Sequence, residues 1–135
     1  MANGSHVALP AELREPSSTD KSIEIWIGEV TAAAVLAGFQ ALVDFEKFGA
    51  MTAETREENG TRIAQLFVLS QQAPDEIDFP AVVRRTGAHA LHTHYDAAYR
   101  ACYGKNFPEV VVDGIITDLL EILAKVAATE RMLAH

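Results

Sequence analysis

Apolar residues recur every three or four positions in four segments of the chain, which is the spacing of one face of an α-helix. The first segment begins near Asp20, a suitable N-cap, and can close at Gly49. Its apolar positions are Ile23, Trp26, Ile27, Val30, Ala34, Ala37, Ala41 and Phe45. Isoleucines also alternate over residues 23–27 as they do in a strand, but no convincing partner strand follows. We therefore predict a helix.

The second segment begins at Thr52, runs through Ile63 and Leu66, and stops before Pro74. The pair Asn59-Gly60 inside it is a turn signal that can break a helix.

The third and fourth segments each follow a proline, a residue favoured in the first turn of a helix. The third begins near Pro80 and ends at Gly104, and the fourth begins near Pro108 and continues toward the C-terminus. The fourth carries a wide apolar stripe: Val112, Ile115, Ile116, Leu119, Ile122, Leu123, Val126 and Leu133. Short connections between long helices predict an all-α fold, an antiparallel four-helix bundle over residues 20–135. Residues 1–19 have no sustained periodicity and are interpreted as a flexible N-terminal arm.

The first helix is unusually apolar around its whole circumference between Val30 and Val43. Its small residues let a neighbouring backbone approach closely, inside the bundle or across an interface: Gly28, Ala32, Ala33, Ala34, Ala37, Gly38 and Ala41. A helix that is apolar all round is normally buried on all sides, and four helices alone cannot easily bury one of their number. We therefore expect a homodimer to which this helix contributes.

Composition narrows the classes of function. The net charge is −8, and the 11 Lys and Arg residues are scattered except for Arg84-Arg85, which disfavours nucleic-acid binding. An acidic surface suits solubility or capture of a basic protein. The uncharged run from Val30 to Val43 is too short to span a bilayer, and no secretory signal opens the chain, so we expect a cytoplasmic protein without a membrane partner.

The single cysteine, Cys102, cannot form an internal disulfide and is expected to be a buried, inert thiol.

The stretch RRTGAHALHTHYDAAYRACY at residues 84–103 holds the candidate chemistry. On a helix, one stripe of this stretch is polar: Arg85, His89, His92, Asp96, Tyr99 and Tyr103. A nearly opposite stripe is small and apolar apart from one histidine: Val83, Gly87, Ala90, His94, Ala97 and Ala101. We therefore predict that His94 faces inward, while His89, His92 and Asp96 share an exposed face.

The polar stripe can bind a metal or a partner. His89 and His92 are three residues apart and can ligate one divalent metal, with Asp96 as a further ligand or a group that orients a ring. Other helices would complete the site with carboxylates such as Glu54, Glu57, Asp118 and Glu121. The Glu-x-x-His pattern of di-metal bundles is absent. The alternative is a polar face whose residues hydrogen-bond one another or meet a partner chain.

Two weak resemblances concern this chemistry. The pairs Glu54/Glu57 and Asp118/Glu121 resemble, in spacing alone, the carboxylates that hold Mg²⁺ in all-helical nucleotide pyrophosphohydrolases. Arg84-x4-His89 resembles the Arg-x(4–6)-His spacing of HEPN-type ribonucleases, which are helical and often dimeric. Arg85 stands where that pattern usually has a polar residue after the arginine.

Together, these patterns favour a soluble, acidic, helical interaction module without a cofactor, which binds a protein partner in an inhibitor- or immunity-type role. The alternative is a metal-dependent helical hydrolase, similar to the pyrophosphohydrolases, with a site around His89, His92 and Asp96. The sequence alone does not decide whether the protein is an enzyme.

Overall fold

The computed structural model describes residues 20–134, with side chains from Ile23 onward. This part of the chain consists of four helices and contains no strand: α2 (Asp20–Phe48), α3 (Ala53–Gln72), α4 (Phe79–Tyr103) and α5 (Glu109–Leu133). The predicted all-helical fold is confirmed. The predicted N-terminal arm, residues 1–19, lies outside the described residues.

The helices begin and end close to the predicted positions because local caps define them. The Thr52 side chain accepts a hydrogen bond from the Thr55 backbone N–H at the start of α3. Asp78 accepts one in the same way from Ala81 at the start of α4, a cap that the proline signal did not reveal. Gly104 ends α4 with a φ of 75°, the left-handed conformation that glycine adopts without a steric penalty.

The two ambiguous signals have clear outcomes. Residues 23–27 are helical, as predicted, and belong to the first turns of α2. Asn59-Gly60 does not break α3. Gly60 lies on an exposed part of α3 with no other atom within 4 Å of a Cβ built on it, so this glycine weakens the helix locally without ending it.

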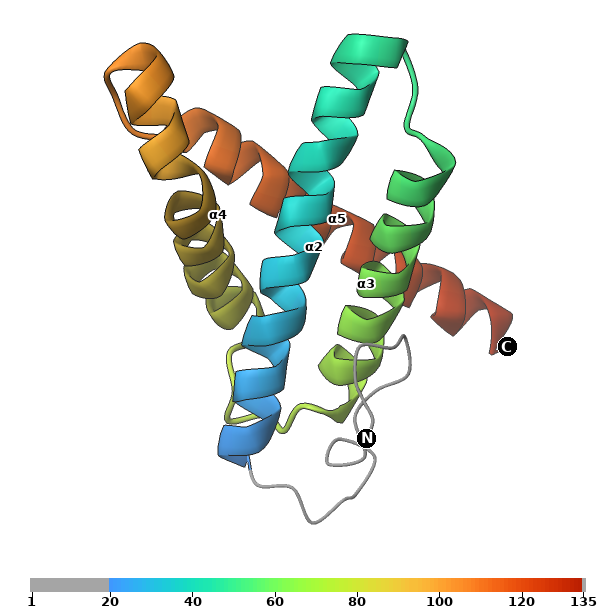
Figure 1. Cartoon of the computed structure of the whole chain (residues 1–135). Coiled ribbons are helices and arrows are strands. Elements are labelled where there is room, and N and C mark those ends of the chain that lie inside the picture. Colours follow the sequence, from blue (N-terminus) through green and yellow to red (C-terminus); the bar gives the residue numbers. More distant parts are fainter. Residues whose placement is uncertain (1–19, 135) are drawn as a thin grey trace, which may run out of the picture.

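The helix α2 is the centre of the arrangement and packs against α3, α4 and α5 (Figure 1). Successive helices α2, α3 and α4 alternate in direction, so α2 and α4 run the same way (Figure 1). The last helix, α5, lies behind α2 and α3 and crosses them obliquely (Figure 1). The helical bundle is therefore confirmed, but an antiparallel alignment of all four helices is not shown.

The core forms where these helices meet. Its largest fully buried apolar side chains are Ile27, Leu66, Leu69, Leu91, Val35, Val83 and Val112. Two small residues allow the close packing of α5: a Cβ at Gly38 would lie 3.2 Å from Ile115, and a Cβ at Gly87 would lie 3.2 Å from Ile116 and from Val35. At Gly38, the small residue of α2 therefore allows close packing against α5 within the same chain.

A buried carboxylate holds the α2–α3 corner together. Asp44 is 2% exposed and accepts hydrogen bonds from the Gln40 side chain (2.9 Å) and from the backbone N–H and hydroxyl of Thr52 (3.1 and 3.2 Å). Hydrogen bonds from Thr55, Gln40 and Thr52 lower the pKa of Asp44 from 3.8 to about 2. The residue that ends the apolar part of α2 thus also fixes the N-cap of α3.

The prediction that His94 faces inward is wrong, because His94 is exposed. The buried line of α4 runs through Val83, Gly87 and Leu91 and continues to the half-buried Tyr95. Residues four apart turn by about 40° relative to each other, so the inward face rotates away from His94 along the helix.

The prediction of a buried thiol is also wrong, because Cys102 is exposed in the last turn of α4.

One segment of the described residues, Ile23–Phe48, is long and apolar enough to cross a membrane by length and composition alone. This is a longer stretch than the uncharged run noted in the sequence. Core helices of soluble proteins have the same composition, and this segment supplies Ile27 and Val35 to the core. The expected cytoplasmic location stays a prediction.

Candidate functional site

A groove of about 1000 Å³ runs along the boundary between α2 and α4. Within the part of the chain that the structure describes, two helices line it, with the following residues: Glu24, Ile25, Gly28, Glu29, Ala32, Leu36, Val82, Arg85, Thr86, His89, Ala90, Thr93 and His94. The side chains on α2 repeat at helical spacing from Ile25 to Leu36, so the groove follows one face of α2 for several turns.

Small residues make the floor of the groove. A Cβ built at Gly28 would lie 3.2 Å from the Thr86 methyl group, which shows how closely α2 and α4 approach here. Ala32 and Ala90 line the groove farther along. Because these side chains are short, the space above the contact stays open to a bulky apolar group.

The two walls of the groove carry opposite charges. Glu24 and Glu29 lie on the α2 side, and Arg85 lies on the α4 side beside His89 and His94. Glu24 and Arg85 form an ion pair of 3.0 Å across the groove, with side chains 46% and 61% exposed. An exposed pair of this kind adds little stability, so it can be exchanged for contacts with another molecule at small cost.

The helix α5 covers the other side of the α2–α4 pair. Gly38 of α2 and Gly87 of α4 both contact α5, and no residue of α5 lines the groove. One face of the α2–α4 pair is therefore packed in the core, and no other described helix covers the opposite face.

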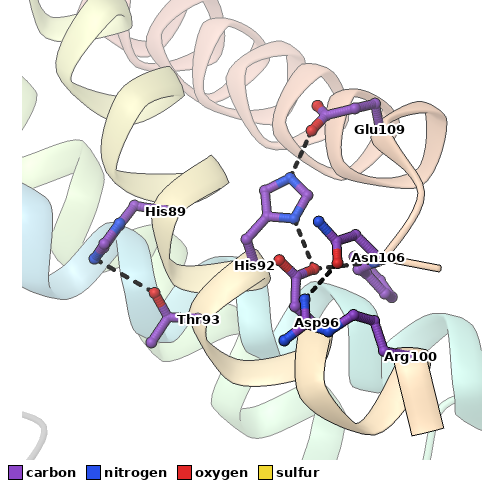
Figure 2. A network of polar contacts seen from close by, with 8 residues as sticks. His89, His92, Thr93, Asp96, Arg100, Asn106 and Glu109 are labelled. Carbon is purple, nitrogen blue, oxygen red and sulfur yellow. Dashed lines mark hydrogen bonds and ion pairs between the residues drawn. The ribbon is translucent and has the colours of Figure 1, made fainter. Parts of the chain in front are cut away.

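A second constellation joins α4 to the start of α5 (Figure 2). The Nδ1 atom of His92 lies 2.9 Å from Asp96 Oδ1, and its Nε2 atom lies 2.6 Å from Glu109 Oε2. Asp96 Oδ1 also accepts a hydrogen bond of 2.9 Å from the backbone N–H of Phe107. We call His92, Asp96 and Glu109 the carboxylate–histidine clasp.

The clasp favours the charged form of its histidine. Only the imidazolium can donate from both ring nitrogens at once. The hydrogen bond to Asp96, followed by the bond to Glu109, raises the pKa of His92 above 6.5 against the opposing effect of burial. The bond to His92 likewise lowers the pKa of the Asp96 carboxyl below 3.8.

Aromatic packing holds the same turn in place. Phe107 is buried, and its ring lies 5.1 Å from Phe39 of α2 and 5.2 Å from Tyr95 of α4, measured between ring centroids. Arg100 of α4 also donates a hydrogen bond to Asn106 in the turn (Figure 2). The clasp therefore sits on a turn that is fixed from several directions, and its geometry is that of a structural brace.

The structure divides the predicted polar stripe between two places. Arg85 and His89 line the groove, and the His89 ring is 3.4 Å from the Thr93 hydroxyl. His92 and Asp96 belong to the clasp and are more buried than expected, with side chains 25% and 19% exposed. Figure 2 shows His89 and His92 pointing in different directions, and the groove instead contains both His89 and His94.

The two tyrosines at the end of the stripe take no part in either constellation. Tyr99 and Tyr103 pack against each other with ring centroids 4.5 Å apart, and Tyr99 also packs against Phe107.

The candidate metal ligands are spread over separate surfaces. Glu54 and Glu57 are exposed on α3, and Asp118 and Glu121 are exposed on α5. Within residues 20–134, no three His, Cys, Asp or Glu side chains gather in a way that could hold a metal ion. Both ring nitrogens of His92 contact carboxylates, so this residue would first have to leave the clasp to become a ligand.

Sequence reasoning missed two kinds of residue. Glu109 is absent from the predicted site, although an acidic residue directly after Pro108 suits the first turn of α5. Glu24 and Glu29 were overlooked because they interrupt an otherwise apolar helix, which is the signal that could have marked them as a wall.

No protein family, curated protein or solved structure matches this chain at a significant level.

Proposed function

We propose that this protein is a helical protein-interaction module that docks a helical surface of a protein partner in the groove between α2 and α4. The observation that carries the proposal is the open face of this helix pair, whose other face is covered by α5. A helix laid along such a groove buries its apolar side chains against a second layer, as helices of a bundle do.

The shape and chemistry of the groove support a helix as the occupant. The floor is apolar and follows α2 from Ile25 to Leu36, which is long enough for several turns of a docked helix. Ile25 is 53% exposed at one end, so the chain itself leaves an apolar side chain uncovered there.

The walls define what the partner must carry. The acidic α2 wall with Glu24 and Glu29 suits basic side chains, whereas the α4 wall with Arg85 suits acidic ones. The net charge of −8 favours a basic protein, but the groove itself favours a surface with both signs. A basic partner and an inhibitor- or immunity-type role stay predictions.

A metal-dependent hydrolase has less support from the positions of its candidate residues. Its three central residues divide between the groove, with His89, and the clasp, with His92 and Asp96.

A peptide-display selection tests the proposed function. Helical peptides selected on the wild-type chain should carry apolar residues at positions i, i+3 or i+4, and i+7, and should lose binding to Ala32→Trp, which fills the groove. The matched control is Ala64→Trp, a substitution on α3 outside the groove, which should bind the same peptides as the wild type. Peptides that bind Ala32→Trp as well as the wild type would contradict the proposal.

A further inference from the structure

We propose that the partner in the groove is a second copy of this chain, placed so that the α2–α4 faces of the two copies pack against each other. This inference rests on the proposed function and names its partner. It is carried by the arrangement of charge and apolar surface on the two walls of the groove.

The groove needs a partner with an apolar strip between an acidic row and a row that contains an arginine. The α2–α4 face of this chain has that pattern itself: Glu24 and Glu29 lie on one side, Arg85 and His89 on the other, and short apolar residues between them. An interface between identical copies must be self-complementary, and this face satisfies the requirement.

The symmetry of the pair follows from the same residues. A two-fold axis parallel to the groove places the α2 wall of one copy opposite the α4 wall of the other. Glu24 and Arg85 lie at the same level, because they form an ion pair within one chain. Rotation about this axis does not change the position of a residue along the groove, so Glu24 of each copy faces Arg85 of the other. An axis perpendicular to the groove would instead place like charges opposite each other.

The exposed apolar surface of α2 supports a second copy that packs against it. Only 33% of the most apolar part of α2 is buried within the chain, although the helix is central in the fold. Ile25 and Leu36 both line the groove and would be covered in the pair. The net charge of −8 opposes self-association, but charges separated by more than about 8 Å are largely screened at physiological ionic strength. The opposite charges on the walls act at shorter range.

Charge reversal in two separate chains tests the arrangement. In Glu24→Arg, positions 24 and 85 are both basic, so two such chains meet with like charges at both of these contacts of the symmetric pair. In Arg85→Glu, positions 24 and 85 are both acidic, and the same repulsion applies. When the two variants are mixed, a chain with arginine at positions 24 and 85 faces a chain with glutamate at both positions, so every contact between positions 24 and 85 is again between opposite charges.

The dimer dissociation constant is measured by analytical ultracentrifugation for the wild type, each variant and their equimolar mixture. Each variant alone should dissociate about tenfold more easily than the wild type or worse, and the mixture should recover a dimer that contains one chain of each kind. The matched control Glu121→Arg reverses an exposed charge on α5, outside the groove, and should leave the constant unchanged within about twofold. Circular dichroism and thermal melting of every variant check that each chain is folded.

Each other outcome overturns the inference. A wild-type chain that is monomeric at micromolar concentration has no second copy in the groove. A dimer that both reversals leave intact forms through another surface, and weakened variants whose mixture does not recover exclude the wall-to-wall symmetry. If the wild type is monomeric but groove-binding peptides are selected, the proposed function stands and only the identity of the partner is wrong.

Discussion

His92 and Glu109 lie 17 residues apart in the chain, and their side chains meet at 2.6 Å across the turn between α4 and α5. The other ring nitrogen of His92 meets Asp96 at 2.9 Å, one helical turn along α4. A single imidazole thus connects the C-terminal half of α4 to the first residue of α5, and this contact explains why His92 is held away from the groove.

The first prediction compares two histidines two residues apart. His92→Ala removes both contacts of the ring and leaves the half-buried Asp96 with one partner fewer, so it should lower the free energy of unfolding by about 1–3 kcal/mol. His94→Ala changes an exposed residue and should alter it by less than about 0.5 kcal/mol. Chemical denaturation of both variants measures the difference, and equal effects would contradict the assignment of the clasp.

The second prediction concerns pH. Folding raises the pKa of His92 above its ordinary value of 6.5, so the stabilisation by the charged ring is complete below pH 6.5 and is lost as the pH rises through the folded-state pKa. The free energy of unfolding should therefore decrease with rising pH above 6.5. In His92→Asn this decrease should be smaller. An unchanged slope in the variant would show that other groups cause it.

The third prediction concerns acid stability. The pKa of Asp44 is lowered from 3.8 to about 2, chiefly by hydrogen bonds from Thr55 and Gln40. The stabilisation by this carboxylate is present above pH 3.8 and is lost as the pH falls toward 2. Asp44→Asn should be less stable than the wild type at neutral pH, and its stability should change less between pH 4 and 2. Acid titration followed by circular dichroism tests this, and parallel curves would contradict it.

The fourth prediction concerns a hydroxyl without a partner. Thr31 is fully buried, and within the described residues its Oγ1 atom has no hydrogen-bond partner. Thr31→Val keeps the shape and removes the desolvated hydroxyl, so it should raise the free energy of unfolding by about 1 kcal/mol. The matched control is Thr86→Val, because the Thr86 hydroxyl donates to the Val82 carbonyl oxygen at 2.6 Å. The control should not stabilise the protein; equal stabilisation by both would contradict the argument.

The fifth prediction uses two glycines in helix interiors. Gly60→Ala adds a methyl group in open space on α3 and should stabilise the protein by about 0.5–1 kcal/mol. Gly87→Ala adds one 3.2 Å from Ile116 and Val35, both buried in the core, and should destabilise it by about 1–3 kcal/mol. Thermal denaturation of the two variants measures whether each substitution raises or lowers the stability. A stabilising Gly87→Ala would mean that α5 can move away from α4.

Much of the fold could be predicted because its signals are local. Hydrophobic spacing and terminal residues such as Thr52 and Gly104 act within a few positions of the chain, and they place the helices over nearly the observed bounds. The candidate site was predicted only in part. The helical wheel places Arg85, His89, His92 and Asp96 on one stripe, but His92 turns toward Glu109 and His89 toward the groove.

The sequence by itself determined that this chain forms four long helices, since helix formation depends on the spacing of apolar residues and on caps that lie close in the chain. Only the tertiary structure decided which faces of those helices are covered. The inward face of α4 rotates from Val83 to Tyr95, which exposes His94, and α5 covers Gly38 and Gly87 while the opposite face stays open as the groove. The reason is physical: the direction in which a helix is buried depends on the crossing of its neighbours, and that crossing results from contacts between residues far apart in the sequence.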